Sequence, residues 1–244
     1  MVFRATNGLH PPNPPYFQGR YSNGRVWVEY LSEQLSVKQI NNFARGGATT
    51  VSDRTSLVPG LLAQVQSFTQ TQPQPNSSGL YILWAGANDY LQGARSILVP
   101  IENIKQAISD LSSKGAQRIL VANLPDLGKL PATRNSSELA RLSLLTQQHN
   151  QSLRRALKVL SQQSPELQLI PLDTHALYGE AIANPAKFGF TQVTGVCLSA
   201  SSPCGNPDQF LFWDSIHPTT KAHRILAQSA FTALEKQLLL LNQS

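Results

Sequence analysis

Charged side chains are scarce in this sequence of 244 residues: Asp, Glu, Lys and Arg make up 14% of it, against 41% hydrophobic residues. This balance is typical of a globular protein with an uncharged polar surface, and it argues against extended disorder. The net charge of +6 comes from scattered Lys and Arg residues, with no basic run and no interleaving of basic and aromatic residues. We therefore expect no nucleic-acid partner.

Long apolar runs are also missing from the sequence. None approaches the roughly 20 residues that a transmembrane helix needs, so we expect no transmembrane segment. Met1 is followed by "VFRATNGLHPPNPP", which lacks the apolar core of a signal peptide. No linker-like stretch divides the chain, so we expect a single domain over residues 1–244, and a monomer.

Cysteine is rare, since Cys197 and Cys204 in "CLSASSPC" are the only two. Their spacing suits a small loop closed by a disulfide better than the short Cys-x-x-Cys pattern of a metal site. We predict that the two are bonded and that the protein is exported, to the periplasm or outside the cell. Two unpaired thiols remain the alternative.

Three apolar runs predict buried parallel strands, at Gly79 to Gly86, Arg118 to Pro125 and Leu167 to Asp173. Helical patterns separate them, within Ser96 to Gly115 and within Ser136 to Gln162. Because strands alternate with helices, the sequence predicts an α/β fold with a parallel sheet.

Further elements are expected towards both ends of the chain. An amphipathic helix is predicted from Val26 to Leu35, followed by a weak strand from Val37 to Ala44. A last helix should run from Thr219 to about Leu240. Ligands of open α/β sheets bind beyond the carboxyl ends of the strands, which directs attention to the residues that follow each strand.

Two segments after predicted strands offer hydrogen-bond donors. "FARGGATT" contains Gly46 and Gly47, at which a backbone N–H can face a ligand with no Cβ in the way. "GAND" offers the side-chain amide of Asn88. The alternatives are a tight turn that requires glycine and an Asn that caps the next helix.

A third segment, "DSIHP", places Asp214 three residues before His217. In a short loop this spacing lets the carboxylate accept a hydrogen bond from the imidazole, which fixes its tautomer and stabilises the imidazolium formed during proton transfer. A helix N-terminus capped by the Asp and started by Pro218 is equally compatible with the pattern.

Taken together, these segments resemble the SGNH/GDSL hydrolases. The similarity covers nearly the whole chain and includes "PPYFQGRYSNGRVWVEYL", Pro14 to Leu31. It implies a flavodoxin-like, three-layer α/β/α fold with a parallel sheet, and hydrolysis of carboxylic esters of small molecules, lipids or carbohydrates. It implies no metal and no organic cofactor, and the remaining histidines show no metal-ligand spacing: His10, His149, His175 and His223.

The resemblance also implies roles for individual residues. Gly47, chosen over Gly46 by its spacing to the following Ala-Thr, becomes a backbone oxyanion donor, and Asn88 a side-chain oxyanion donor. His217 becomes the general base and Asp214 the carboxylate that orients it. Two preorganised donors would stabilise the oxyanion of a tetrahedral intermediate.

The family's first motif, Gly-Asp-Ser, does not occur in this sequence. We therefore assign no nucleophile. Ser22 in "GRYSNG" lacks the strand-to-helix setting of a nucleophile, and Ser215 lies in the same short loop as the Asp-His pair. The first strand of the family's sheet, between the strands matching Val37 to Ala44 and Gly79 to Gly86, is expected to be missing with the motif.

Two hypotheses follow. In the first, the protein is a GDSL ester hydrolase whose gene begins upstream of Met1, so that this chain is inactive by itself. In the second, it is a catalytically dead relative that binds a carbohydrate or acyl ligand, and a gene remnant is a weaker third. The presence of Gly47, Asn88, Asp214 and His217 together favours the first, because a binding protein does not need an Asp-His pair.

Overall fold

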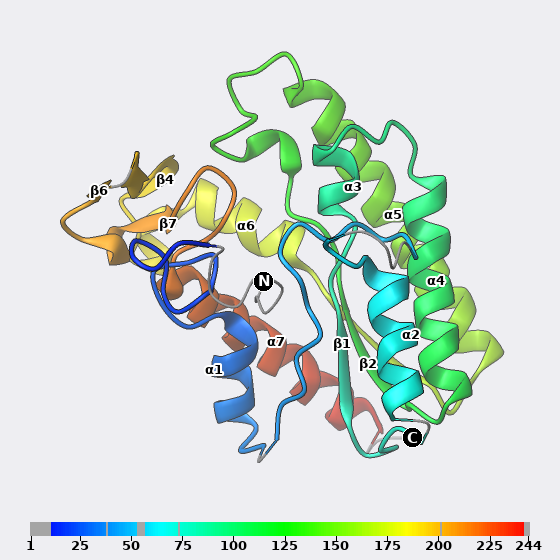
Figure 1. The fold of residues 1–244 in the computed structure, drawn as a ribbon. Helices are drawn as coiled ribbons and strands as arrows, with labels where there is room; N and C mark the ends of the chain where they lie inside the picture. Colours follow the sequence, from blue (N-terminus) through cyan, green and yellow to red (C-terminus); the bar gives the residue numbers. More distant parts are fainter. Residues whose placement is uncertain (1–10, 38, 53–56, 73, 201, 242–244) are drawn as a thin grey trace. The chain divides into compact units, whose positions relative to one another are not determined.

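The computed structural model describes residues 11–37, 39–52, 57–72, 74–200 and 202–241 (Figure 1). The chain forms two compact units, each assembled from segments that are apart in the sequence. Unit 1 comprises Met1–Asn42, Pro125–Arg141 and Thr174–Ser244, and unit 2 comprises Phe43–Leu124 and Leu142–Asp173. Asp214 and His217 therefore belong to unit 1, whereas Gly47 and Asn88 belong to unit 2.

Unit 2 is built on a three-stranded parallel sheet in the order β1-β2-β3, with β1 (Leu80–Leu83), β2 (Arg118–Ala122) and β3 (Gln168–Leu172). Every β2 residue after Arg118 is buried, as expected for a central strand with neighbours on both edges. The apolar runs predicted these three strands and their parallel arrangement, and both predictions are confirmed. The fold is α/β.

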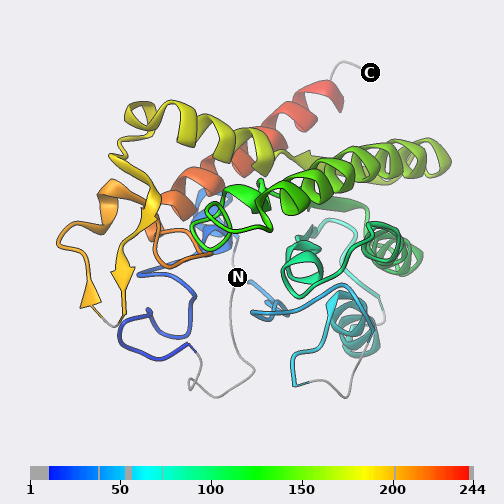
Figure 2. The same ribbon diagram turned by 90° about the horizontal axis from the view of Figure 1, so that it is seen from above.

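Helices cover one face of this sheet. The long ones are α2 (Leu61–Thr71), α4 (Leu98–Ser113) and α5 (Leu139–Gln163), of which α5 lies in unit 2 from Leu142 onwards. α2 packs against α4, as both views show (Figures 1 and 2). A single buried cluster joins the three helices to the sheet through Val65, Ile108, Leu157 and Ile119. Gly115 follows α4 with a φ of +104°, a left-handed conformation that favours glycine at the end of a helix.

The described residues of unit 1 form three longer helices and two small sheets. The helices are α1 (Trp27–Gln34), α6 (Thr174–Ala183) and α7 (Thr220–Leu241). The parallel pair consists of β4 (Gln192–Val196) and β7 (Phe210–Phe212), and the antiparallel pair of β5 (Leu198–Ser199) and β6 (Ser202–Pro203). The described part of this unit also has three short 3-10 helices: η1 (Leu127–Lys129), η2 (Pro185–Phe188) and η3 (Pro207–Gln209).

The helix α1 packs along α7 within unit 1 (Figure 1). Both helices agree with the sequence prediction to within about two residues, since their apolar residues recur at helical spacing. Among the residues that the structure describes, no helix is both long and apolar enough to cross a membrane.

The predicted strand from Val37 to Ala44 is wrong. Its described residues, 37 and 39–44, are not part of a strand. Two of its apolar side chains are about half exposed, with Val37 at 49% and Ile40 at 50%. Because neither side chain finds an apolar surface to cover it, nothing holds this segment in a sheet.

Candidate active site

The loop between β7 and α7 folds around the carboxylate of Asp214. Its Oδ2 lies 2.7 Å from Nδ1 of His217, and its Oδ1 accepts hydrogen bonds from the backbone N–H groups of Ile216 at 2.8 Å and His217 at 2.7 Å. Trp213 closes the turn by donating its backbone N–H to the His217 carbonyl at 2.8 Å. Since α7 begins only at Thr220, Asp214 caps this turn rather than the helix.

Both side chains of this pair are 15% exposed. Burial by itself raises the pKa of Asp214, but the hydrogen bonds from His217 and Ile216 and the attraction of the imidazole outweigh burial and hold the pKa below its usual range. The carboxylate is thus ionised at neutral pH. When His217 donates its Nδ1–H to this carboxylate, Nε2 is left as the proton acceptor.

Two tyrosines that sequence reasoning did not single out lie against this pair. The hydroxyl of Tyr16 donates to Asp214 Oδ2 at 2.8 Å, and the ring of Tyr21 stacks on the imidazole of His217 with centroids 4.7 Å apart. Burial and the bond to Asp214 both raise the pKa of Tyr16 above its usual range, so it stays a donor. Nearly 200 residues separate the two segments, which is why residue spacing carried no signal of this contact.

Ser22 is anchored in the same region of unit 1. Its side chain is fully buried, and its Oγ donates to the carbonyl of Pro218 at 2.9 Å. A hydroxyl that is buried and held in this way is poorly placed to attack a substrate. Ser215, in contrast, is exposed.

In unit 2, the two segments predicted to hold oxyanion donors meet each other. The Asn88 side chain, on the short helix α3 (Ala87–Leu91), donates to the Ala48 carbonyl at 2.9 Å, and Gln92 donates to the Gly47 carbonyl at 3.0 Å. Gly47 has a φ of +80°, and a Cβ added there would touch nothing within 4 Å. Glycine is therefore favoured at this position by backbone conformation and not by lack of space.

A buried carboxylate ties the same two segments together. Asp89 accepts the backbone N–H of Thr50 at 3.0 Å and the Thr50 hydroxyl at 2.7 Å. Burial raises the pKa of Asp89, and the bonds from Thr50 oppose this rise. Asn103 adds a further bond to the Thr50 hydroxyl at 3.1 Å. The bonds between Thr50 and Asp89 thus hold together the two backbone segments that carry the predicted donors.

The turn from β1 into α3 rests on a buried histidine of α5. A Cβ added to Gly86 would lie 2.7 Å from Cε1 of His149. Nδ1 of His149 lies 2.8 Å from the Tyr90 hydroxyl, and its Nε2 has no hydrogen-bond partner among the described residues. Burial lowers the pKa of His149 to about 4, so the imidazole is neutral. Sequence reasoning treated this histidine only as a poor metal ligand.

Cys197 and Cys204 form a disulfide in the structure, with an S–S distance of 2.03 Å. The bridge closes the hairpin of β5 and β6 and packs in a buried cluster with Trp213, the residue before Asp214. Leu198 donates its backbone N–H to the Trp213 carbonyl at 2.7 Å. The hairpin is therefore bonded to the loop that carries the Asp-His pair.

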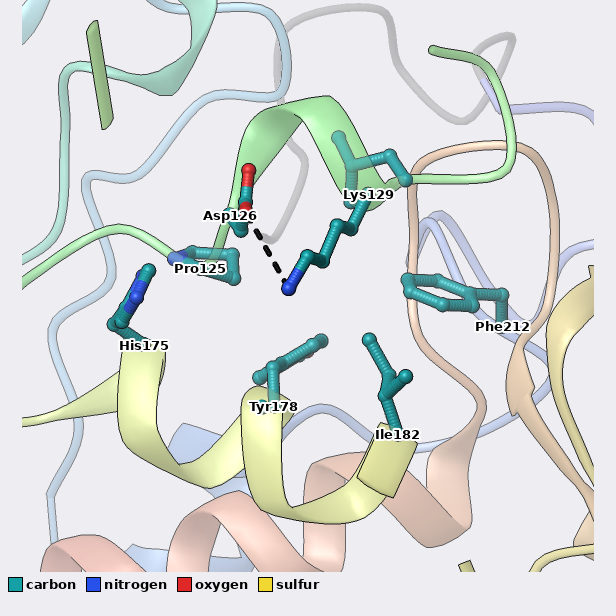
Figure 3. Close-up of a pocket in the computed structure, with 9 residues that line it drawn as sticks. Pro125, Asp126, Lys129, His175, Tyr178, Ile182 and Phe212 are labelled. Atoms are coloured by element: carbon teal, nitrogen blue, oxygen red, sulfur yellow. Dashed lines mark ion pairs between the residues drawn. The ribbon is translucent and has the colours of Figure 1, made fainter. Parts of the chain in front are cut away.

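Unit 1 also contains a small pocket between the segment that follows β2, helix α6 and Phe212 (Figure 3). Asp126 and Lys129 form an ion pair of 3.8 Å at its edge, opposite His175 and Tyr178. Its volume of about 30 Å³ has room for a few water molecules at most. None of the four predicted site residues lines it.

Metal ligands are not grouped in the described ranges. No three His, Cys, Asp or Glu side chains there lie together as a metal site requires. The chemistry that these residues offer is proton transfer by an oriented histidine in unit 1 and hydrogen-bond donation by a braced backbone and amide in unit 2.

Several known proteins are similar to this chain in sequence. The chain is 29% identical to a phosphatidylcholine-sterol acyltransferase of Aeromonas hydrophila, with 97% of this chain and 86% of that protein covered. It is 31% identical to the GDSL esterase/lipase APG of Arabidopsis thaliana, covering 86% of this chain and 77% of that protein. A thermolabile hemolysin of Vibrio parahaemolyticus is 27% identical over 93% of this chain, which spans only 59% of the hemolysin.

Solved structures share the fold. A GDSL-like lipase from Parabacteroides merdae matches with a TM-score of 0.56 and 12% identity, over 92% of this chain and 87% of that one. A lipolytic protein of the G-D-S-L family from Veillonella parvula matches with a TM-score of 0.50 and 18% identity, over 93% and 92%. The family described as GDSL-like Lipase/Acylhydrolase matches residues 4–230, and the chain belongs to this family.

Proposed function

We propose that this protein is a carboxylic-ester hydrolase in which His217 is the general base and Asp214 orients it. The observation that carries the proposal is the 2.7 Å contact between Asp214 Oδ2 and His217 Nδ1, which leaves Nε2 to take a proton from a hydroxyl nucleophile. Relatives named as an acyltransferase and as an esterase/lipase support acyl transfer. The substrates we infer are esters of small molecules, lipids or carbohydrates.

In this proposal the backbone N–H of Gly47 and the side-chain amide of Asn88 stabilise the oxyanion. The contacts within unit 2 support these roles, because Gln92 and Ala48 hold the two groups in place. An amide nitrogen carries two hydrogens, so Asn88 keeps one after bonding to Ala48. Loss of one such donor typically costs about 100- to 1000-fold in kcat.

We further propose that the nucleophile is a serine of the family's Gly-Asp-Ser motif, which the sequence of this chain does not contain. The reason is chemical: an oriented histidine needs a hydroxyl to deprotonate, and the Ser22 hydroxyl is buried against Pro218. The chain described here should then have negligible esterase activity by itself. Export to the periplasm or outside the cell belongs to the same proposal and agrees with the disulfide.

The proposal is tested by hydrolysis of a short p-nitrophenyl ester. We expect negligible turnover by this chain and clear turnover by a chain extended with the segment encoded upstream in the same frame. In the extended protein His217→Ala should remove most of the activity, whereas His175→Ala, at an exposed histidine of α6, should not.

Two results would contradict this proposal. Turnover by the chain alone that Ser22→Ala abolishes would make Ser22 the nucleophile. An in-frame stop codon directly upstream of Met1 would favour a relative that binds an acyl or carbohydrate ligand without hydrolysing it.

A further inference from the structure

Two aromatic side chains of the N-terminal segment enclose the Asp214–His217 pair within unit 1. Tyr16 donates its hydroxyl to Oδ2 of Asp214 at 2.8 Å, the same oxygen that faces Nδ1 of His217 at 2.7 Å. Tyr21 lies over one face of the imidazole, with an angle of 27° between the ring planes and 4.7 Å between the centroids. Each tyrosine thus contacts a different member of the pair.

We propose that Tyr16 and Tyr21 are positioning residues that set the orientation and the proton affinity of the general base. Tyr16 holds the carboxylate oxygen that receives the imidazole N–H, and Tyr21 supports the imidazole ring. This inference rests on the proposed function, since it assigns a task to the residues around the same histidine.

The segment from Tyr16 to Asn23 is fixed well enough for this task. Phe17 donates its backbone N–H to the Ser22 carbonyl at 2.9 Å, and Ser22 Oγ donates to Pro218. The side chain of Asn23 accepts the backbone N–H of Thr220 at 2.8 Å. The segment is therefore bonded to the residues that directly follow His217.

Aromatic packing fixes the Tyr16 ring in addition. It meets Tyr21 edge to face at 5.9 Å between centroids, and Trp213 in the same manner at 6.5 Å. Trp213 precedes Asp214 and is 2% exposed. The hydroxyl of Tyr16 is thus aimed at the carboxylate by a packed ring, which limits the conformations that Asp214 can adopt.

The two tyrosines should affect the protonation of His217 in opposite directions. A hydroxyl that donates to a carboxylate reduces the negative charge available to an adjacent imidazolium, so Tyr16 disfavours the protonated form. An aromatic face attracts a cation, so Tyr21 favours it. Among the described residues, Asp214 from its own loop and His223 of α7 also interact electrostatically with this imidazole.

The experiment follows the titration of the His217 Cε1–H signal by NMR in protein labelled at histidine. In Tyr16→Phe the titration midpoint of His217 should move to higher pH, which corresponds to a rise of about threefold in its protonation constant. In Tyr21→Leu it should move to lower pH, by about two- to fivefold. Tyr21→Phe keeps the aromatic ring, so its midpoint should equal that of the parent protein.

A matched control is Tyr30→Phe. Like Tyr16→Phe, this substitution removes a side-chain hydrogen bond, in this case the 2.8 Å bond between the hydroxyls of Tyr30 and Thr220. The Tyr30 hydroxyl does not bond to Asp214 or His217. This variant should leave the midpoint unchanged. Shifts of the same sign in Tyr16→Phe and Tyr21→Leu, or shifts no larger than in Tyr30→Phe, would overturn the inference, because general loosening of the loop does not produce opposite signs.

The titration requires no nucleophile and no turnover, so it is measured on this chain as it exists. If the two shifts are opposite in sign but the extended protein hydrolyses no ester, the proposed function is refuted and the positioning role stands. If Tyr16→Phe does not fold, the comparison of Tyr21→Leu with Tyr21→Phe still decides the matter, since equal midpoints in those two variants would overturn the inference.

Discussion

At the scale of single residues, Gly86 combines two constraints. Its φ of +110° lies in the left-handed region, and a Cβ added there would approach Cε1 of His149 to 2.7 Å. Gly93, after the same short helix, shares the first constraint with a φ of +105°, but a Cβ added there meets nothing within 4 Å. Substitutions at Gly86 and Gly93 therefore distinguish the effect of backbone strain from that of steric conflict.

We predict that Gly93→Ala lowers the free energy of unfolding by about 1 kcal/mol through strain alone. Gly86→Ala should cost at least about 1 to 3 kcal/mol more, because the imidazole of His149 fills the space that the new methyl group needs. Urea unfolding of both variants measures the difference. Equal losses would show that His149 does not restrict this turn.

At the scale of elements, α1 depends on a charged side chain that caps its N-terminus. Glu29 accepts the backbone N–H of Val26, at the helix N-terminus, at 2.9 Å, and pairs with Arg20 at 2.6 Å. Burial raises the pKa of Glu29, but the hydrogen bonds from Arg20 and Val26 outweigh burial and lower it. A carboxyl whose folded pKa is depressed stabilises the protein above its unfolded pKa, and this contribution is lost as the pH falls through the folded pKa.

We predict that Glu29→Gln lowers the free energy of unfolding at pH 7 by about 1 kcal/mol. The difference from the parent protein should disappear as the pH falls through the folded pKa of Glu29, which Arg20 and Val26 hold below its usual range. Glu33→Gln is the control, because its side chain is 68% exposed and pairs with Arg25 at the surface. A loss in Glu29→Gln that does not change with pH would contradict the role of its charge.

The disulfide-closed hairpin is the second element with a measurable contribution. The bridge between Cys197 and Cys204 closes a short loop, for which the chain-entropy model gives roughly 2.5 kcal/mol at most. We predict that reductant lowers the free energy of unfolding, measured by urea unfolding, by no more than this amount. Alkylation followed by mass analysis checks the bond itself: two alkylatable thiols in exported protein without reductant would show that it is absent.

At the scale of the whole molecule, each unit contains a buried histidine that resists protonation. His149 in unit 2 is fully buried, and His223 in unit 1 is 2% exposed. Burial lowers the pKa of His149 to about 4 and lowers that of His223 well below its usual range. The unfolded chain therefore binds more protons than the folded one below about pH 6.5, and stability must fall as the pH drops.

We predict that the free energy of unfolding decreases from pH 7 towards pH 4, with His149 alone contributing about 3 kcal/mol to the loss. Urea unfolding at several pH values measures the slope. His149→Gln should flatten it, because glutamine does not titrate, whereas His175→Gln at an exposed position should not. An unchanged slope in His149→Gln would contradict the prediction.

The sequence alone was sufficient for the features that depend on near neighbours in the chain. Apolar runs predicted the strands β1, β2 and β3, and the helices follow from apolar residues at helical spacing. The contact of Asp214 with His217 spans three residues, so a tight turn brings the two together. The strand predicted from Val37 to Ala44 was wrong for the opposite reason: a short segment with apolar residues forms a strand only if another surface covers those side chains.

Only the tertiary structure decided the contacts that surround the predicted residues. Tyr16 reaches Asp214 across 198 positions, Tyr90 reaches His149 across 59, and Thr50 reaches Asp89 across 39. A side chain can form such a bond only after the intervening chain has folded back, and no spacing rule encodes that path. Sequence motifs therefore predicted the site residues, and long-range packing determined what holds those residues in place.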